Sequence, residues 1–346
     1  MLGLLARADY ALRQSARVAW FTGHYLASRR GQIRAARNSG VKPPKRSTPS
    51  TKELMEDMGS LFGRDLANAK AGLYPVPYDH DGSLREIISR SRQYFSDLPS
   101  VERRRAERDG KEVFEEQNDA ALPRYYQQNF HYQTDGYLSD HSAKLYDLQV
   151  EVLFTGAANA MRRQALVAMA EFMHGRDQRN VNMLDLACGT GRFLRFARQA
   201  YPRLNLSGLD LSNAYLAEAG RHLKKLKHIG LVCANAEKLP FENSSQDLVS
   251  SIFLFHELPP KIRKIVAAEI ARVLKPKGRF IFIDSLQTGD RPKYDGLLEL
   301  FDNGFHEPYF STYVKEDFTR LFAAHGLHPV EQTRAFLSKV VVYEKG

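Results

Sequence analysis

The second half of the chain contains two kinds of segment that alternate. From Asn180 onward, seven apolar runs typical of strands are interleaved with four runs typical of helices. The strand candidates are residues 181–187, 204–210, 229–234, 247–255, 279–285, 328–333 and 336–344, and the helix candidates are residues 191–200, 212–225, 260–274 and 315–325. This alternation predicts an α/β fold with a parallel, doubly wound sheet. A very short loop separates the last two strands, so we expect that pair to be antiparallel.

A loop with two glycines follows the first strand candidate. In residues 184–194, LDLACGTGRFL, Gly189 and Gly191 predict a turn that holds a nucleotide-like ligand at the start of a helix. A dinucleotide-binding loop would have a third glycine where this chain has Leu194. Asp185, four residues before Gly189, would repel a pyrophosphate but would attract an ammonium or a sulfonium. The loop therefore favours a cationic ligand over a dinucleotide.

This loop resembles motif I of the class I S-adenosylmethionine-dependent methyltransferases, whose pattern the segment LDLACGTG fits. Two later segments resemble motifs of the same family in the same order, namely residues 234–241, ANAEKLPF, and residues 272–284, RVLKPKGRFIFID. The resemblance covers about half of the chain, from Asn180 to the C-terminus. It implies a Rossmann-like seven-stranded methyltransferase sheet with an antiparallel C-terminal strand, and S-adenosyl-L-methionine as the cofactor.

The resemblance also implies which residues hold the cofactor. Asp210 would accept hydrogen bonds from both ribose hydroxyls, and Asn235, where the family often has aspartate, would accept from the adenine amino group. A turn without a ligand is the alternative for Asn235. The expected cofactor-binding residues are Asp185, Ala187, Cys188, Gly189, Thr190, Gly191, Asp210, Leu211, Asn235, Ala236 and Phe255. Before the fifth strand, Lys277 replaces a common glycine, and we expect Gly278 to supply the positive φ of that turn.

Three segments are candidates for the acceptor site: residues 124–137, 253–260 and 301–313. Methyl transfer requires alignment of the acceptor and sometimes a base that removes a proton. The catalytic candidates are His256, Glu257, His131, His306 and Tyr309. His256 could equally be a structural histidine, and the aromatic segment RYYQQNFHYQTDGY could be core rather than a lid formed with His131 and Tyr137.

The acceptor class is narrowed by motifs that the sequence lacks. Glu257 and Leu258 precede the Pro259–Pro260 pair, which does not match the [DNS]-P-P-[YF] motif of amino-methylating nucleic-acid enzymes. No cysteine follows Cys233, whereas cytosine-C5 enzymes need one as a nucleophile. By analogy with quinone and lipid methyltransferases, we expect a small, hydrophobic acceptor. An RNA- or protein-modifying methyltransferase and a non-catalytic cofactor-binding subunit are the alternatives.

The N-terminal segment carries the whole net positive charge. The chain has 50 Lys or Arg and 40 Asp or Glu, and residues 1–52 hold eleven of the former and one of the latter, which leaves 39 of each elsewhere. A neutral body disfavours nucleic acid as a partner. Residues 1–37 predict a basic amphipathic helical arm that binds an anionic membrane surface. Packing on the body, a cleaved organelle presequence and an RNA-binding arm are the alternatives.

These patterns divide the chain into four segments. Residues 1–37 form the arm, residues 38–52 a linker rich in Pro, Ser, Thr and Lys, residues 53–175 an α-helical cap or substrate region, and residues 176–346 the cofactor-binding methyltransferase domain. Within the cap, residues 97–100 predict a break between helices. One long helix is expected from about Ser139 to His174, with Ser139 or Asp140 as its N-cap.

Two cysteines, Cys188 and Cys233, predict neither a disulfide nor a metal site, and we expect both to be small buried side chains. The sequence has no apolar run of transmembrane length and no secretory signal. The expected location is therefore cytoplasmic, peripheral at the inner membrane face if the arm binds lipid. The sequence leaves the oligomeric state open.

Overall fold

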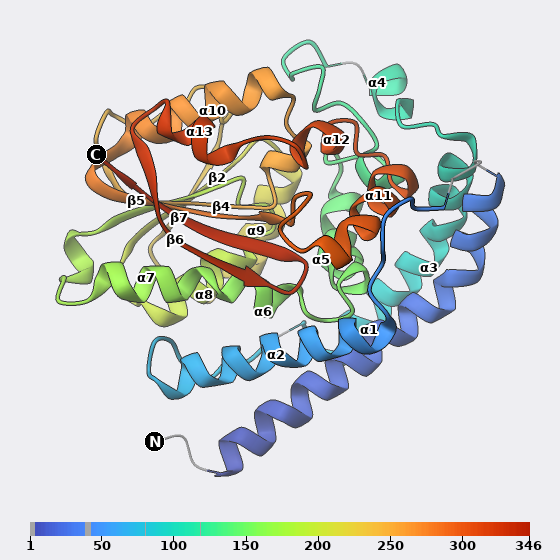
Figure 1. The fold of residues 1–346 in the computed structure, drawn as a ribbon, viewed down its shortest axis with the longest axis horizontal. Helices are drawn as coiled ribbons and strands as arrows, with labels where there is room; N and C mark the ends of the chain where they lie inside the picture. Colours follow the sequence, from blue (N-terminus) through green and yellow to red (C-terminus); the bar gives the residue numbers. More distant parts are fainter. Residues whose placement is uncertain (1–3, 39–42, 80, 118) are drawn as a thin grey trace. The chain divides into compact units, whose positions relative to one another are not determined.

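The computed structural model describes residues 4–38, 43–79, 81–117 and 119–346 (Figure 1). The chain forms two compact units. Unit 1 comprises Met1–Glu56, Val76–Asn159 and Arg291–Pro308, and unit 2 comprises Asp57–Pro75, Ala160–Asp290 and Tyr309–Gly346. These boundaries differ from the four consecutive segments expected from the sequence, because each unit gathers stretches that are distant in the chain.

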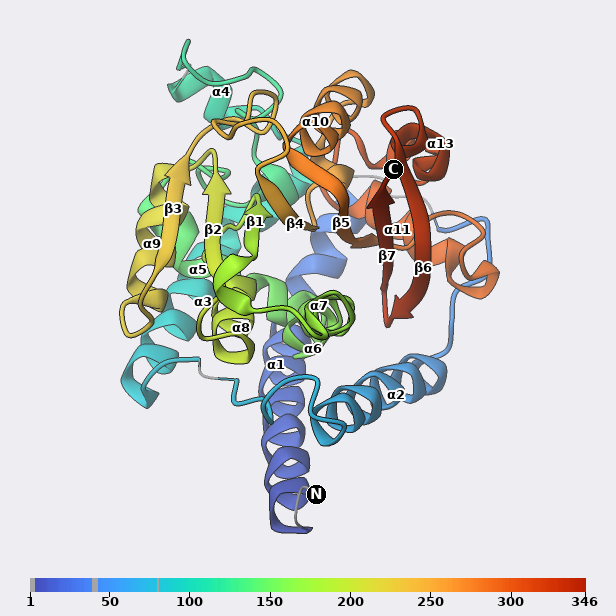
Figure 2. The same ribbon diagram turned by 90° about the vertical axis from the view of Figure 1, so that its left-hand side faces the viewer.

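Unit 2 contains a seven-stranded sheet with the order β3-β2-β1-β4-β5-β7-β6 (Figure 2). Its strands are β1 (Asn182–Leu186), β2 (Asn205–Asp210), β3 (Ile229–Cys233), β4 (Gln246–Ile252), β5 (Leu274–Ser285), β6 (Leu327–Ala335) and β7 (Ser338–Lys345). The first five strands are parallel, and β7 pairs antiparallel with both β5 and β6. This confirms the predicted fold class, including the antiparallel C-terminal strand.

Helices cover both faces of this sheet. Helices α7 (Ala165–Met173) and α8 (Arg192–Ala200) lie on one face, and α10 (Pro260–Val273) and α13 (Phe318–Ala323) lie on the other (Figure 1). The remaining helices of unit 2 are α9 (Asn213–Leu223), η2 (Gln178–Asn180), η3 (Phe255–Glu257) and α12 (Phe310–Tyr313), while α2 (Thr51–Lys70) and α6 (Ala158–Arg163) each cross a unit boundary in the sequence. Because both faces are covered, the central strands are largely apolar, and Leu184, Val249 and Ile281 are fully buried.

A buried ion pair holds the α2 part of unit 2. Asp65 and Arg163 are both buried, and Arg163 Nη2 donates to Asp65 Oδ2 over 2.6 Å. The Tyr74 hydroxyl donates to Asp65 Oδ1 over 2.8 Å. This arrangement satisfies the buried carboxylate, which would otherwise be strongly destabilising.

Unit 1 is mainly helical. It contains α1 (Leu4–Asn38), α3 (Leu84–Glu107), α4 (Glu112–Gln117), η1 (Phe130–Tyr132), α5 (Asp140–Leu153), η4 (Pro292–Tyr294) and α11 (Asp295–Gly304). Phe21 of α1, Tyr94 of α3 and Leu148 of α5 belong to one buried apolar cluster. Helices α1, α3 and α5 therefore share a core.

One face of the N-terminal arm is part of that core. Tyr10, Gln14, Arg17, Phe21 and His24 are buried at intervals of three or four residues along α1. Arg17 pairs with Asp79, Asp81 and Glu151. The arm is therefore a helix, as predicted. Its buried face packs on the rest of unit 1, which was one of the alternatives.

Two helix boundaries predicted for the cap region are wrong. Helix α3 continues through Pro99, although proline has no N–H to donate within the helix. Buried residues before Pro99 (Tyr94) and after it (Arg104 and Arg105) hold the helix in place. The long helix expected from Ser139 to His174 is divided into α5, α6 and α7.

The first of these divisions follows α5 and has a steric cause. Thr155 and Gly156 both have positive φ there. A Cβ on Gly156 would lie 3.3 Å from backbone atoms of Arg17 and Val18, so α1 approaches the chain closely at this point. The predicted N-cap is confirmed, since Ser139 accepts a hydrogen bond from Ser142 N over 3.1 Å.

Two further sequence predictions need correction. Lys277, not Gly278, has the positive φ, at 63°. Gly278 is needed for a different reason, because a Cβ there would lie 2.8 Å from Lys275 O and 3.0 Å from Asp247 O. Cys188 is buried as expected, but Cys233 is exposed because β3 is an edge strand of the sheet.

Among the residues that the structure describes, no helix has both the length and the apolar character needed to cross a membrane.

Helix α8 approaches strand β2 closely. A Cβ on Gly208 of β2 would lie 2.5 Å from Leu194 Cδ1 and 2.8 Å from Cys188 Sγ. Leu194 is fully buried and occupies the position at which a dinucleotide-binding loop has its third glycine. The close helix–strand contact is therefore present, with the glycine on the strand instead of the helix.

We expect Gly208→Val to destabilise the chain by about 1–3 kcal/mol, because the new side chain overpacks the contact with Leu194. Equilibrium urea unfolding measures this change. Gly220→Ala is the matched control, since a Cβ at Gly220 meets nothing within 4 Å on the exposed side of α9. That control should be neutral or slightly stabilising. Equal stability of the two variants would contradict the close approach.

Candidate functional site

The loop between β1 and α8 has a backbone that favours glycine at specific positions. Ala187, Gly189 and Gly191 have φ values of 57°, 53° and 76°. A Cβ on Gly191 would lie 3.0 Å from Leu223 Cδ1, so this glycine allows α9 to pack against the loop. A Cβ on Gly189 would meet nothing within 4 Å. The backbone at Gly189 therefore faces open space, which a ligand can approach closely.

Asp210, the last residue of β2, holds this loop in place. Its Oδ2 accepts a hydrogen bond from Gly189 N over 2.8 Å, and its Oδ1 accepts one from Ser212 N over 2.9 Å. Burial raises the pKa of Asp210, and the backbone N–H groups of Ser212 and Gly189 oppose that rise. Each carboxylate oxygen keeps a further lone pair, so Asp210 can still accept hydrogen bonds from two hydroxyls of a ribose.

Asp185 lies on the neighbouring strand β1 and is only 2% exposed. Its Oδ1 accepts a hydrogen bond from the Ser250 hydroxyl over 2.6 Å, directly across the β1–β4 pairing. Burial raises the pKa of Asp185 to about 7, and the charge of Asp210 adds to this rise, whereas Ser250 and Arg162 oppose it. A cation that binds beside a buried carboxyl with a raised pKa stabilises the ionised form of that carboxyl.

These observations fit a nucleoside ligand that carries a positive charge. The open space at Gly189, the oriented Asp210 carboxylate and the unsatisfied preference of Asp185 for a cation are the features that S-adenosyl-L-methionine requires. Thr190 and Cys188 of the loop are buried. Burial raises the pKa of the Cys188 thiol well above its ordinary value, so this cysteine is unreactive.

At the expected adenine end, Asn235 forms a local turn. Its Oδ1 accepts a hydrogen bond from Glu237 N over 2.9 Å, and its Nδ2 donates to Glu237 Oε1 over 3.0 Å. This is the geometry of the alternative, a turn residue. Leu211 and Ala236 are half-buried near the ends of β2 and β3. Contacts of these three residues with adenine stay predictions.

The prediction that Phe255 contacts the cofactor is wrong. Its side chain is 0% exposed and lies among Phe280, Phe282, Phe318 and Phe322. The run of apolar residues before His256 bends into the short helix η3 after β4 ends at Ile252, and this bend turns the Phe255 side chain into the core.

His256 forms a buried pair with Asp284 at the carboxyl ends of β4 and β5. His256 Nδ1 lies 2.6 Å from Asp284 Oδ1. Asp284 also accepts hydrogen bonds from Phe255 N over 2.8 Å and Ser285 N over 2.7 Å, so its carboxyl acts as an acceptor throughout. The Nδ1 of His256 must then carry the hydrogen, which gives Nε2 the lone pair.

Other residues of unit 2 fix this pair. The His256 ring packs edge-on against Tyr313 with ring centroids 6.0 Å apart. The fully buried Arg263 donates to Phe255 O over 2.9 Å and to Tyr309 O over 2.8 Å, which joins η3 to α12. Among the catalytic candidates, the structure therefore places Glu257 beside His256, with Glu257 Oε1 3.8 Å from His256 Nε2. Tyr309 is linked to this pair through its backbone carbonyl and Arg263.

The other two catalytic candidates, His131 and His306, belong to unit 1. His131 Nε2 lies 3.0 Å from Glu307 Oε1, and His131 N donates to His306 O over 3.1 Å. His306 Nε2 lies 2.8 Å from Gln128 Oε1, and burial lowers the His306 pKa. His306 is thus neutral at pH 7. Within unit 1, His131 and His306 therefore lie next to each other.

Sequence reasoning missed Asp284, Ser250 and Arg263. A signal for Asp284 was present, because it ends the strand candidate beside the one that leads to His256, and carboxyl ends of neighbouring parallel strands meet. Ser250 had a weaker signal, as a polar residue inside an apolar strand. No signal pointed to Arg263, since its partners come from a distant stretch that follows residue 308.

We expect Asp185→Asn to change how stability depends on pH. The folded state raises the pKa of Asp185 from 3.8 to about 7, so wild-type stability falls as pH rises through this range, and the variant lacks that loss. Relative to wild type, the variant should gain about 2 kcal/mol between pH 5 and pH 8, measured by urea unfolding. A pH-independent difference would contradict the raised pKa.

The same substitution should alter cofactor binding. Ionised Asp185 attracts a cation, so wild-type affinity for S-adenosylmethionine should fall below about pH 7, and the variant should lose this dependence. Calorimetric titration with S-adenosylmethionine and with S-adenosylhomocysteine separates the two cationic groups. A loss confined to the former points to the sulfonium, and an equal loss points to the ammonium. Normal binding of both by the variant would remove Asp185 from the site.

Comparison with known proteins places the methyltransferase signal in the part of the chain that carries this site. Residues 183–278 match a family model described as a methyltransferase domain. The chain is 42% identical over 98 residues to a malonyl-[acyl-carrier protein] O-methyltransferase of Alcanivorax borkumensis, which covers 28% of this chain and 32% of that protein. It is 32% identical over 164 residues to a demethylmenaquinone methyltransferase of Thermotoga maritima, which covers 47% of this chain and 66% of that protein.

One solved structure shows a weaker similarity. The crystal structure of geranyl diphosphate C-methyltransferase from Streptomyces coelicolor, in complex with S-adenosyl-L-homocysteine, covers 53% of this chain and 77% of its own, with 16% identity and a TM-score of 0.40. The chain spans from one third to just under two thirds of the curated relatives given above. The motif order, the strand order of the sheet and the matched family model together show a methyltransferase domain with the class I, Rossmann-like fold in this part of the chain.

Proposed function

We propose that the chain transfers a methyl group from S-adenosyl-L-methionine to a small, hydrophobic acceptor of the quinone, lipid or prenyl kind. The observation that carries the catalytic part of this proposal is the buried His256–Asp284 pair at the carboxyl ends of β4 and β5, since ligands of open α/β sheets bind at that edge.

His256 is the general base in this proposal. Its Nε2 takes the proton that the acceptor oxygen or carbon loses as the new bond to the methyl group forms. Asp284 is a positioning residue, which fixes the ring through Nδ1 and stabilises the imidazolium that results. The cofactor, when bound, supplies the electrophilic methyl group, and Gly189, Asp185 and Asp210 are the residues that would hold it.

The relatives support the acceptor class. The Thermotoga maritima protein is named for demethylmenaquinone, and the Alcanivorax borkumensis protein is named for a malonyl group on an acyl-carrier protein. Of these two names, demethylmenaquinone fits a quinone-like acceptor directly. The buried aromatic rings of Phe310 and Tyr313 pack on His256 and make the surroundings of this histidine apolar. Such surroundings suit an apolar acceptor better than a nucleic acid, whose binding would need positive charge.

The test is a transfer assay with S-adenosylmethionine labelled in its methyl group and a membrane lipid extract as the acceptor pool. We expect label in the organic phase, and we expect none with Asp210→Ala because the cofactor is lost. If the chain binds S-adenosylhomocysteine yet labels neither lipid, protein nor RNA, it is a non-catalytic cofactor-binding subunit. Label in protein or RNA alone would overturn the proposed acceptor class.

The base assignment predicts a loss in His256→Asn. The kcat for the labelled acceptor should fall by about 10²–10⁴ while S-adenosylhomocysteine binds normally, because the substitution removes proton transfer but leaves the glycine loop intact. His228→Asn is the matched control, since His228 is an exposed histidine of unit 2 whose positive φ asparagine tolerates. Full activity of His256→Asn would show that acceptor deprotonation needs no base here.

We also propose that the chain works at the inner face of an anionic membrane, held there by the outer face of α1. Leu5, Leu12, Leu26 and Ile33 are 87%, 72%, 54% and 43% exposed. They are seven or fourteen residues apart, so they follow one another along one side of the helix. Exposed Arg7 and Arg29 suit anionic headgroups and would repel a second copy of the helix.

Vesicle flotation tests this attachment. The full chain should float with vesicles of phosphatidylglycerol and phosphatidylcholine more than with phosphatidylcholine alone. Leu12→Gln should weaken partitioning about fivefold, the effect of about 1 kcal/mol of lost apolar burial. Leu84→Gln is the matched control, because Leu84 on α3 is 71% exposed. Equal flotation of both variants would remove the membrane proposal.

A further inference from the structure

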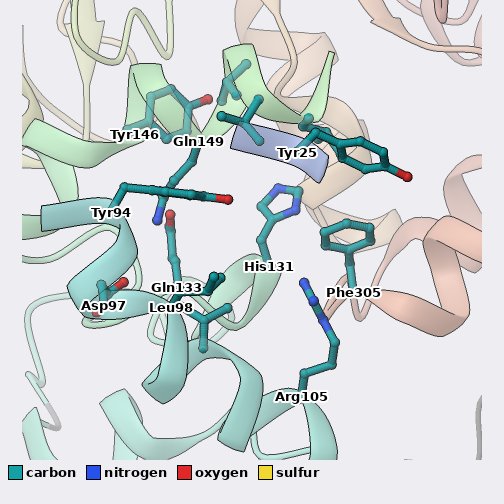
Figure 3. Close-up of a pocket in the computed structure, with 14 residues that line it drawn as sticks. Tyr25, Tyr94, Asp97, Leu98, Arg105, His131, Gln133, Tyr146, Gln149 and Phe305 are labelled. Carbon is teal, nitrogen blue, oxygen red and sulfur yellow. The ribbon is translucent and has the colours of Figure 1, made fainter. Parts of the chain in front are cut away.

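Unit 1 encloses a pocket of its own (Figure 3). Its walls come from α3, α5 and the segment around η1, with Tyr25 of α1 and Phe305 completing them, and its volume is about 120 Å³. An apolar protein cavity of roughly 150 Å³ is large enough for benzene. The pocket is therefore the size of one six-membered ring.

Arg105 is the charged group that most distinguishes this pocket. It is only 7% exposed, and its guanidinium lies 5.1 Å from the centre of the Phe305 ring. Among the residues whose side chains the structure describes, none forms an ion pair or a hydrogen bond with this guanidinium, and its buried Nε has no acceptor. Burial lowers the pKa of Arg105, against the opposing effects of Tyr132, Glu102 and Tyr94.

The neighbouring arginine shows what a structural role looks like in the same helix. Arg104 is 2% exposed, pairs with Glu112 over 3.1 Å and donates to Tyr132 O over 3.0 Å. Every direction of the Arg104 guanidinium is thus used by the fold. A buried cation that no anion contacts directly is costly, so an anion in the pocket would stabilise Arg105.

Two amides add polar groups without partners. Gln133 is 4% exposed, and its Nε2 has no acceptor, while the buried Oε1 of Gln149 has no donor. Both side chains line the pocket, and Figure 3 shows them on the side away from Arg105. They offer one donor and one acceptor, which suits a hydroxyl group.

The acidic groups near the pocket are engaged elsewhere. Asp97 Oδ1 accepts a hydrogen bond from Thr134 Oγ1 over 2.6 Å, and Glu307 Oε1 lies 3.0 Å from His131 Nε2. Figure 3 shows Asp97 and Arg105 on different sides of the pocket. An anion would therefore be placed at the Arg105 end.

The backbone beside the pocket is also unusual. His131, which lines it, and the next residue, Tyr132, both have positive φ, at 56° and 59°. Two consecutive residues of this kind, neither of them glycine, are strained, and such strain concentrates at ligand sites.

We propose that this pocket binds a small aromatic carboxylate, with its carboxylate on Arg105, its ring against Phe305 and Tyr94, and a polar ring substituent between Gln133 and Gln149. The site lies within unit 1 and does not depend on methyl transfer by unit 2. The guanidinium offers two parallel donors that match a carboxylate, and the ring faces apolar walls.

Calorimetric titration of the full chain tests the recognised chemistry. Benzoate should bind, benzamide, its neutral isostere, at least about tenfold more weakly, and acetate more weakly still because it lacks the ring. 4-Hydroxybenzoate should bind more tightly than benzoate. If benzoate and benzamide bind equally, or if neither benzoate nor 4-hydroxybenzoate binds, the proposal is overturned.

Variants separate binding from a structural role. Arg105→Gln should lower benzoate affinity more than about tenfold without lowering the thermal midpoint, whereas Arg92→Gln, an exposed arginine of the same helix, should leave affinity unchanged. Should Arg105→Gln unfold, Arg105→Lys keeps the charge and must still bind benzoate more tightly than benzamide, or the proposal fails.

Gln149→Leu should abolish the advantage of the 4-hydroxyl group while benzoate binding is kept. An unchanged preference for the hydroxyl would remove the two amides from the site. Normal binding of S-adenosylhomocysteine by each variant shows that unit 2 is folded. A chain that fails to bind benzoate can then still transfer methyl groups, and a chain that fails to transfer methyl groups can still bind benzoate.

Discussion

The contact of Leu194 with Gly208 is the constraint on which the cofactor-binding end of unit 2 depends. It brings α8 against β2 so closely that no Cβ fits between them. In the loop that precedes α8, Ala187, Gly189 and Gly191 all have positive φ. Gly189 N of this loop donates a hydrogen bond to Asp210 Oδ2. The position of the loop therefore also fixes the carboxylate at the end of β2.

Three carboxyl groups, of which Asp185 and Asp284 are buried and Asp210 is half-buried, share one edge of the sheet, and each is satisfied differently. Asp210 accepts from backbone N–H groups, Asp185 accepts from a serine hydroxyl, and Asp284 accepts from backbone and from His256. Hydrogen bonds from neutral donors compensate only part of the desolvation of a carboxylate. The pKa values of Asp185 and Asp210 are raised because some of this desolvation cost is not compensated. A bound cationic ligand would compensate the remainder.

The sequence predicted what short-range patterns control. Alternating runs predicted the parallel strands, and the loop from Asp185 to Gly191 predicted a ligand site from residues that are adjacent in the chain. Prediction was wrong where distant contacts decide the outcome. Gly156 ends α5 because α1 crosses there, and Phe255 enters the core because four phenylalanines from β5 and α13 surround it. Asp284 was missed because its partner His256 lies in η3, 28 residues earlier in the chain.

Buried arginines in this chain show why a polar group without a partner is informative. Arg163 is matched by Asp65, Arg263 by carbonyl groups and Glu316, and Arg104 by Glu112. In each case the fold supplies the oxygen atoms that desolvation of a guanidinium demands. Arg105 is nearly as buried as these, yet the described contact of its guanidinium is with an aromatic ring, and a ring contact recovers about 2 kcal/mol or less. Arg163, Arg263 and Arg104 thus each have oxygen partners within the fold, and the oxygen atoms for Arg105 are left to come from a ligand.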